Sequence, residues 1–208
     1  MKNYGFRPSV IDGTEHSIEL PKSLDLPAAY SYEDVLPPVI DQGADPICVP
    51  CSASAYLNWR ENLVDGVPRD NKINLFEIYS AKRGDGEGMT FKEAFRYLRH
   101  HGVSSKKGVL RIGEYVLLRN ILEIKYALLA NGPCFGALPV YGDGPHFWRK
   151  EESAHGTLLG YHAISLVGYT EDSLIIRNSW GRGFGDNGYT LIKYGELGKM
   201  LEAWSIVG

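Results

Sequence analysis

Two cysteines stand three residues apart in the stretch "DQGADPICVPCSASA", at Cys48 and Cys51, and Gln42 precedes them. Such a pair can bind a metal, belong to a disulfide framework, or supply the nucleophile of an enzyme. A zinc site needs a second pair of Cys or His at a similar spacing, and the third cysteine, Cys134, stands alone. We therefore expect no metal site. Three cysteines are a low, odd number, which argues against a disulfide scaffold.

A nucleophilic cysteine needs a base, and the base needs a group that orients it. His162 begins the apolar run "HAISLVGY", and Asn178 lies in the run "SLIIRNSW", with a turn predicted between the two runs. Adjacent antiparallel strands would bring both side chains to one end of a sheet. The Asn178 carbonyl would then accept from one ring nitrogen of His162 and leave the other for the cysteine. Trp180 would cover this hydrogen bond and exclude water.

The position of each cysteine in a helix bears on its reactivity. The spacing of apolar residues predicts a helix over residues 47–65. A thiolate in the first turn of a helix is favoured by the helix dipole and by unpaired N–H groups. Cys48 and Cys51 both meet this condition, so the helix alone does not choose between them.

Helical patterns come first in the chain and strand patterns follow. Further helices are predicted over residues 74–83, 90–101 and 120–133, with a capping box at Thr90 and Glu93. Short apolar runs rich in β-branched residues predict strands over 134–141, 162–169, 173–180, 188–194 and 203–208. This order indicates an α+β fold with two segregated lobes. We expect an irregular N-terminal arm (1–37), a helical lobe (38–118) and a β-rich lobe (119–208).

Charge and hydropathy argue against nucleic acids and membranes as partners. The chain has 208 residues, and its formal charge of −3 provides no basic field for nucleic acid. No apolar run is long enough to span a bilayer, and the N-terminal residues lack the apolar core of a secretory signal. We expect neither a nucleic-acid nor a membrane partner. A reducing, cytoplasmic compartment is the default, with association with a virion or export by a non-classical route as alternatives. The oligomeric state is open.

Three blocks of the sequence resemble the signature blocks of the papain family of cysteine proteases. These blocks are "DQG…CVPCSA", "YHAISLVGY" and "IRNSWGRGFGDNGY". The resemblance implies a papain-like α+β fold, with the nucleophile helix in one lobe, an antiparallel, barrel-like sheet in the other, and the cleft between them. It implies a thiol protease that cuts polypeptides and needs no cofactor. The N-terminal run "GFRPSV…LPKSLDL…LPPVIDQG" resembles bacterial, archaeal and viral members more than animal and plant enzymes.

The resemblance also implies catalytic roles. A glutamine six residues before the nucleophile contributes to the family's oxyanion hole, and Gln42 stands six residues before Cys48. We therefore predict Cys48 as the nucleophile, His162 as the base and Asn178 as the group that orients it. Cys51 as nucleophile remains an alternative that needs an insertion after Gln42. Val49 and Pro50 depart from the family pattern.

The resemblance further implies where a substrate would lie. It predicts main-chain contact at Gly88 and a pocket bordered by Met89, Gly160 and Ala163, with Trp180 beside the catalytic histidine. Glu202 would lie near the floor of that pocket and admit a basic residue, or it is simply a solvated side chain.

The predicted reaction is hydrolysis through a thioester acyl-enzyme. A leader-cutting peptidase or an amide transferase of the same fold is one alternative, and a catalytically silent binding or structural protein is another. The arm either packs as structure or lies in the cleft as a short inhibitory segment; the sequence favours neither.

Overall fold

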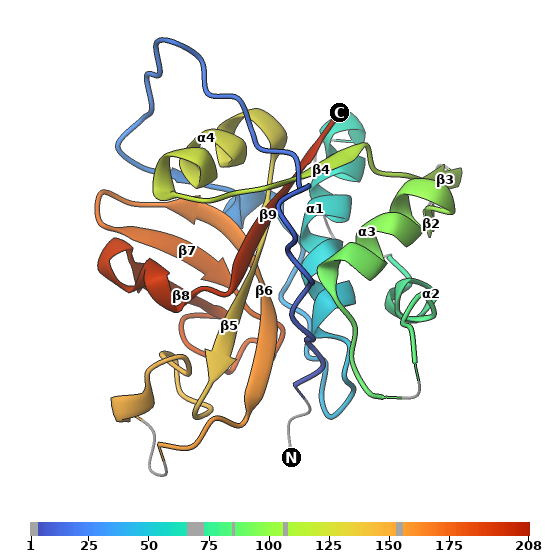
Figure 1. Cartoon of the computed structure of the whole chain (residues 1–208), viewed down its shortest axis with the longest axis vertical. Helices are drawn as coiled ribbons and strands as arrows, with labels where there is room; N and C mark the ends of the chain where they lie inside the picture. Colours follow the sequence, from blue (N-terminus) through green and yellow to red (C-terminus); the bar gives the residue numbers. More distant parts are fainter. Residues whose placement is uncertain (1–3, 66–72, 85, 106–107, 153–155) are drawn as a thin grey trace.

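The computed structural model describes residues 4–65, 73–84, 86–105, 108–152 and 156–208. The main sheet lies on one side of the long helix α1 (Cys48–Asp65), and the helices α2 (Leu75–Tyr79) and α3 (Phe91–His100) lie on the other, as Figure 1 shows. Helix α1 contacts strand β6 (Gly160–Tyr169) and the helices α2 and α3. This arrangement agrees with the α+β fold predicted from the sequence.

The helices begin where the sequence predicts. The Thr90 side chain accepts from the backbone N–H of Glu93, and the Glu93 side chain accepts in return, so the capping box of α3 is formed. Helix α4 (Ile121–Asn131) begins after Asn120, whose side chain accepts from the backbone N–H of Glu123. Helix α2 ends at Tyr79, four residues before the predicted end. Short 3₁₀ helices lie at Glu33–Val35, Lys150–Glu152 and Tyr194–Lys199.

Among the described residues, the main sheet has seven strands, and all its neighbours pair antiparallel. The order is β4-β9-β5-β6-β7-β8, with β1 also paired to β6. The strands are β1 (Tyr30–Ser31), β4 (Glu114–Leu117), β5 (Cys134–Val140), β6, β7 (Ser173–Arg177), β8 (Tyr189–Lys193) and β9 (Glu202–Val207). A separate hairpin pairs β2 (Val103–Ser105) with β3 (Gly108–Leu110).

The predicted strands of the second half are all present, whereas β1 to β4 were not predicted. Strand β4 lies within residues 38–118, the range predicted for the helical lobe, yet it pairs with β9 in the main sheet. The chain therefore joins the main sheet twice before α4, at β1 and at β4. Within the described residues, no helix combines the length and apolar character needed to cross a membrane.

Two apolar clusters hold the molecule together. One lies around the sheet and α4 and includes Leu128, Leu166 and Trp148. The other joins α1 and α3 to the central strands and includes Phe95, Phe135 and Trp204. Because the second cluster contains residues from both the helices and the sheet, the two halves share one buried interface.

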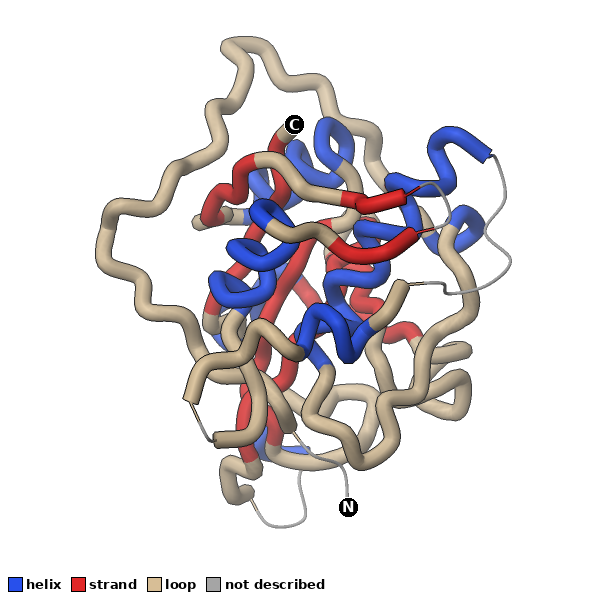
Figure 2. Tube along the Cα trace, turned by 90° about the vertical axis from the view of Figure 1, so that its right-hand side faces the viewer, coloured by secondary structure: helices blue, strands red, loops and turns tan. Residues whose placement is uncertain are grey.

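The N-terminal arm runs along this interface. In Figure 1 it rises in dark blue between the sheet and α3, and the side view in Figure 2 shows long loop segments outside the helices. Phe6 forms a parallel bridge with Met89, and Ser17 forms another with Leu117. The arm then joins the sheet as β1. Its first described residues are thus packed into the body of the protein.

Candidate active site

Strands β6 and β7 bring His162 and Asn178 together. Ser165 pairs with Arg177 across the two strands, so His162 and Asn178 lie at the same end of the sheet. The His162 Nε2 atom is 2.7 Å from Asn178 Oδ1. The hydrogen bond between these two side chains, predicted from the strands and their turn, is therefore present.

The neighbouring backbone fixes which ring nitrogen carries the proton. The backbone N–H of Ser179 donates to Asn178 Oδ1 at 2.7 Å. Because an N–H group only donates, the atom that it contacts must be the amide oxygen. That oxygen only accepts, so Nε2 of His162 must donate to it. In the neutral ring Nδ1 is then the acceptor, the form required of a general base.

Trp180 covers this pair, as predicted. Its ring centroid lies 4.7 Å from that of His162, with 32° between the two planes. Phe147 packs against both rings. His162 itself is fully buried, so the bond to Asn178 is shielded from water.

Cys48 is the first residue of α1, and its side chain is fully buried. Its sulfur receives backbone hydrogen bonds that favour the thiolate, including those of Ala163 and Gly5. Burial outweighs them and raises the pKa of the thiol to about 11. The expected effect of the helix start is present, because the backbone N–H groups of Cys48 and Val49 lower the pKa, but burial has the larger effect.

Gln42 is also buried, and Ser179 holds it. Its Oε1 accepts from the Ser179 hydroxyl at 2.6 Å, and its Nε2 donates to the carbonyl of Asp45 at 2.8 Å. The backbone N–H of Gln42 donates to the carbonyl of Ser179 at 2.9 Å. The segment before the helix is therefore tied to the segment that carries Asn178.

Cys51 lies one helical turn after Cys48 and faces different neighbours. Burial raises the pKa of its thiol further, the charge of Cys48 adds to this effect, and the Ser179 side chain and the Arg177 charge oppose it. Cys48, by contrast, shares an apolar cluster with Met89 and Ala163. Of the two thiols, Cys48 is the one that lies among the residues predicted to bind substrate.

The arm occupies these predicted substrate positions. The backbone N–H of Met89 donates to Gly5 O at 2.9 Å, and the backbone N–H of Arg7 donates to Met89 O at 3.0 Å. Gly88, predicted as the main-chain contact, uses its N–H for Tyr79 and its carbonyl for the Arg7 side chain. Backbone pairing with the arm therefore falls on Met89, one residue after the predicted position.

The arm and the segment before α3 approach each other so closely that only glycine fits at Gly5 and at Gly88. A side chain at Gly5 would lie 2.0 Å from Pro46 O, and one at Gly88 would lie 2.4 Å from Gly5 O. Gly88 also has a φ of +86°, which disfavours other residues. Tyr4 lies against Gly160, and its ring centroid is 6.2 Å from that of Trp180.

Glu202, predicted at the floor of the pocket or else solvated, is buried. Its Oε1 accepts from the backbone N–H of Ser9 at 2.7 Å, and its Oε2 accepts from the Trp204 indole. The solvated alternative is therefore wrong. Phe6 is buried against Phe91, with their ring centroids 5.0 Å apart.

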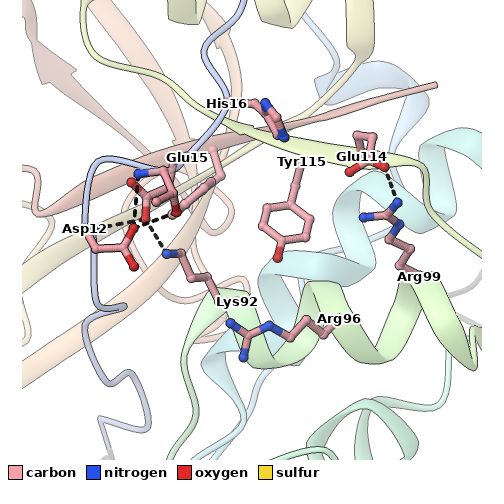
Figure 3. Close-up of a pocket in the computed structure, with 10 residues that line it drawn as sticks. Asp12, Glu15, His16, Lys92, Arg96, Arg99, Glu114 and Tyr115 are labelled. Carbon is pink, nitrogen blue, oxygen red and sulfur yellow. Dashed lines mark hydrogen bonds and ion pairs between the residues drawn. The ribbon is translucent and has the colours of Figure 1, made fainter.

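Charged residues on α3 anchor the arm beyond the cleft. Arg7 forms two hydrogen bonds to Glu93, at 2.8 and 2.9 Å. Figure 3 shows Lys92 reaching from α3 to Glu15 of the arm. Lys92 also donates to the backbone carbonyl of Val10 at 2.6 Å. The sequence analysis missed these contacts, and the basic and acidic residues of α3 were the signal available.

Comparison with known families decides the assignment. The model described as "Papain family cysteine protease" matches residues 79–203. The chain belongs to the papain family of cysteine proteases. This match contains His162 and Asn178 but begins after Cys48. The nucleophile block therefore rests on the residues and geometry described above.

The curated relatives of this papain-family chain are partial matches. Ananain from Ananas comosus is 35% identical over 125 residues, which are 57% of this chain and 35% of that protein. A gut-specific cysteine proteinase from Caenorhabditis elegans is 29% identical over 57% of this chain and 35% of its own length. The chain thus spans about a third of each of these two relatives.

Solved structures share the fold over more of the chain. Xylellain, a cysteine protease from Xylella fastidiosa, has a TM-score of 0.80 at 21% identity, covering 99% of this chain and 96% of that one. Procathepsin B S9 from Trypanosoma congolense has a TM-score of 0.75 at 18% identity, covering 94% and 84%. The papain-like fold predicted from the sequence is therefore confirmed.

Proposed function

We propose that this papain-family chain is a cysteine endopeptidase that works through a thioester acyl-enzyme. The observation that carries the proposal is the bond between His162 Nε2 and Asn178 Oδ1, which leaves Nδ1 as the proton acceptor. Cys48 stands at the start of α1, and its sulfur receives a backbone hydrogen bond from Ala163, the residue after His162. Together these groups provide a nucleophile, a base and an orienting amide.

In this mechanism the Cys48 sulfur gives its proton to His162 and attacks a peptide carbonyl. The Cys48 backbone N–H and the Gln42 amide stabilise the oxyanion, and a donor of this kind is worth about 3–4 kcal/mol. His162 then protonates the leaving amine, and water hydrolyses the thioester. Asn178 keeps the imidazole ring in the useful tautomer throughout.

We propose that the arm holds the enzyme inactive. The parallel bridge of Phe6 to Met89 and the docking of Tyr4 against Gly160 support this role. The N–H of Gly5 is directed at the Cys48 sulfur, whereas the Gly5 carbonyl is bonded to Met89. A thiolate attacks a carbonyl carbon, whereas the Gly5 group directed at the sulfur is an N–H, so the arm covers the thiol without being placed as its substrate.

Substrate class and setting are part of the same proposal. The substrate is a polypeptide, and Glu202 would accept a basic residue in the pocket when Ser9 of the arm withdraws. The proposal of a bacterial type of enzyme depends on the N-terminal run alone, and the curated relatives named above come from a nematode and a plant. The three cysteines are free thiols, which fits a reducing compartment such as the cytoplasm.

The test is hydrolysis of internally quenched peptides by the full chain and by Gly5→Ala. In this variant the new methyl group would clash with Pro46 O, so the arm cannot bind in the cleft. We expect activity in Gly5→Ala, its loss when Cys48→Ala is added, and its retention when Cys51→Ala is added instead. Loss with Cys51→Ala alone would make Cys51 the nucleophile.

The alternatives give different results in the same experiment. Transfer of the acyl group to an added amine, without hydrolysis, would identify an amide transferase. A folded Gly5→Ala protein that binds peptides but turns none over would identify a silent binding protein. Circular dichroism of each variant establishes that it is folded.

A further inference from the structure

The proposed peptidase mechanism does not use Cys51, although Cys51 lies close to the nucleophile Cys48. Cys48 and Cys51 are the first and fourth residues of α1, and the backbone N–H of Cys51 donates to Ile47 O at 3.0 Å. Residues at this spacing on a regular helix have Cα atoms about 5 Å apart. A disulfide spans Cα separations of about 4.4–6.8 Å. The backbone of the first turn therefore already has the separation that a bridge requires.

The two thiols also influence each other. Charge on Cys48 raises the pKa of Cys51, so their sulfurs are near enough to interact electrostatically. Neither is held in another bridge, since the cysteines are free thiols. The Ser179 side chain, the hydrogen-bond partner of Gln42, also acts on Cys51 and favours its thiolate.

A buried cation faces Cys51. Arg177 is only 4% exposed, and its guanidinium donates to two neutral groups, the Tyr189 hydroxyl at 2.6 Å and Pro38 O at 2.9 Å. Within the described ranges, no carboxylate forms an ion pair with it. Burial has the largest effect on Cys51 and raises its pKa, whereas the Arg177 charge lowers it and the Asp41 carboxylate raises it. A buried guanidinium without an anionic partner is costly, and a thiolate at Cys51 would supply that partner.

We propose that Cys48 and Cys51 are a reversible redox pair, in which a peroxide converts the nucleophile and its neighbour into a disulfide. This inference rests on the proposed function for its consequence, because the bridge removes the nucleophile and stops proteolysis. Formation of the bridge itself needs only the two thiols and the oxidant.

The chemistry balances in two steps. The Cys48 thiolate attacks one oxygen of the peroxide, breaks the O–O bond and becomes a sulfenic acid, with hydroxide leaving and taking up the thiol proton as water. The Cys51 thiolate then attacks the Cys48 sulfur and displaces the hydroxyl group, which leaves as water with the proton from Cys51. Two thiols are oxidised and one peroxide is reduced to two waters. A dithiol reverses the change by thiol–disulfide exchange.

Cys51 protects the nucleophile in this scheme. A sulfenic acid with no resolving thiol proceeds to sulfinic acid, which thiols do not reduce. The arm also protects Cys48 from oxidation, because it buries the thiol and excludes the oxidant until the arm leaves the cleft. We therefore expect Gly5→Ala to oxidise faster than the wild-type chain.

The experiment treats reduced full-length Gly5→Ala protein with hydrogen peroxide, alkylates it under denaturing conditions and measures intact mass. We expect the loss of two hydrogens, alkylation of Cys134 alone, and a peptide map that bridges Cys48 to Cys51. A dithiol should restore all three alkylation sites and most of the peptidase activity. Alkylation of all three thiols after peroxide, or sulfinic acid on Cys48, would overturn the proposal.

Two variants in the Gly5→Ala background complete the test. Cys51→Ala should be inactivated by peroxide and regain less than about one tenth of its activity with dithiol, because sulfinic acid persists. Cys134→Ala, the matched control, should behave as its parent. Full recovery in Cys51→Ala would also contradict the redox pair. A bridge in a chain without peptidase activity would refute the proposed function alone, and an active chain without a bridge would refute this inference alone.

Discussion

Replacing Gly5 with alanine should release the arm from the cleft. The new methyl group would lie 2.0 Å from Pro46 O, 2.3 Å from the Pro46 carbonyl carbon and 2.6 Å from its Cα. All three are backbone atoms next to the start of α1, so no flexible side chain can move aside. Displacing residues 4–7 of the arm relieves this clash without moving α1.

The magnitude follows from the contacts that would be lost. The two backbone hydrogen bonds to Met89 contribute about 1 kcal/mol each, and burial of the Phe6 side chain contributes about 2 kcal/mol. Since about 1.4 kcal/mol corresponds to a tenfold change, and ordering of the arm opposes part of this gain, the open state should become about 10² to 10³ times more populated. The bond of Lys92 to Glu15 keeps the rest of the arm attached to α3.

The assay is the rate of Cys48 alkylation by a small neutral reagent, followed by intact mass and peptide mapping. Gly5→Ala should react about 10² to 10³ times faster than the wild-type chain, in line with the population estimate. Val10→Ala is the matched control, because Val10 lies on the same arm with its side chain 77% exposed, and it should react like the wild-type chain. Equal rates for wild-type and a folded Gly5→Ala would refute the view that the arm controls access to the thiol.

Three further predictions concern specificity, orientation and pH. Glu202→Gln should reduce kcat/KM for peptides with Arg in the pocket while leaving Leu peptides unchanged, and an equal drop for both would end the idea that Glu202 selects basic residues. Asn178→Ala should lower kcat about tenfold to a hundredfold, as expected for one lost hydrogen bond to a catalytic ring, and an unchanged kcat would remove Asn178 from the mechanism. Because burial raises the pKa of Cys48 to about 11, the unfolded chain binds fewer protons above the ordinary thiol pKa of 9.0. The free energy of unfolding should therefore fall as pH rises from 9.0 towards 11, and Cys48→Ala should show a smaller fall in urea titrations.

The His162–Asn178 contact could be predicted because it depends on local patterns. Two apolar runs joined by a short turn define an antiparallel pair, and the pairing of β6 with β7 carries both side chains to one end. The same reasoning located α3 through its capping box. The spacing of apolar residues and the capping residues of a helix both depend on neighbouring positions, so a single sequence is enough to identify them.

The position of the arm and the state of Cys48 could not be predicted in this way. Gly5 reaches Met89 across more than eighty residues of chain, and no local rule favours that contact over solvent. The helix start correctly indicated donors around the Cys48 sulfur, but burial under the arm reverses their effect on its pKa. Strand β4 was missed because four residues are too few to show a strand period, and because its pairing with β9 is a contact between segments far apart in the sequence.

The measurement that tests the central claim most directly is labelling of the Gly5→Ala chain with a peptidyl epoxide that alkylates activated papain-type cysteines. Intact mass and a peptide map would locate the adduct. We predict a single stoichiometric adduct on Cys48, and its loss when His162→Ala is added. An adduct on Cys51, or none in a folded protein, would contradict the assignment of Cys48 and His162 as the catalytic pair.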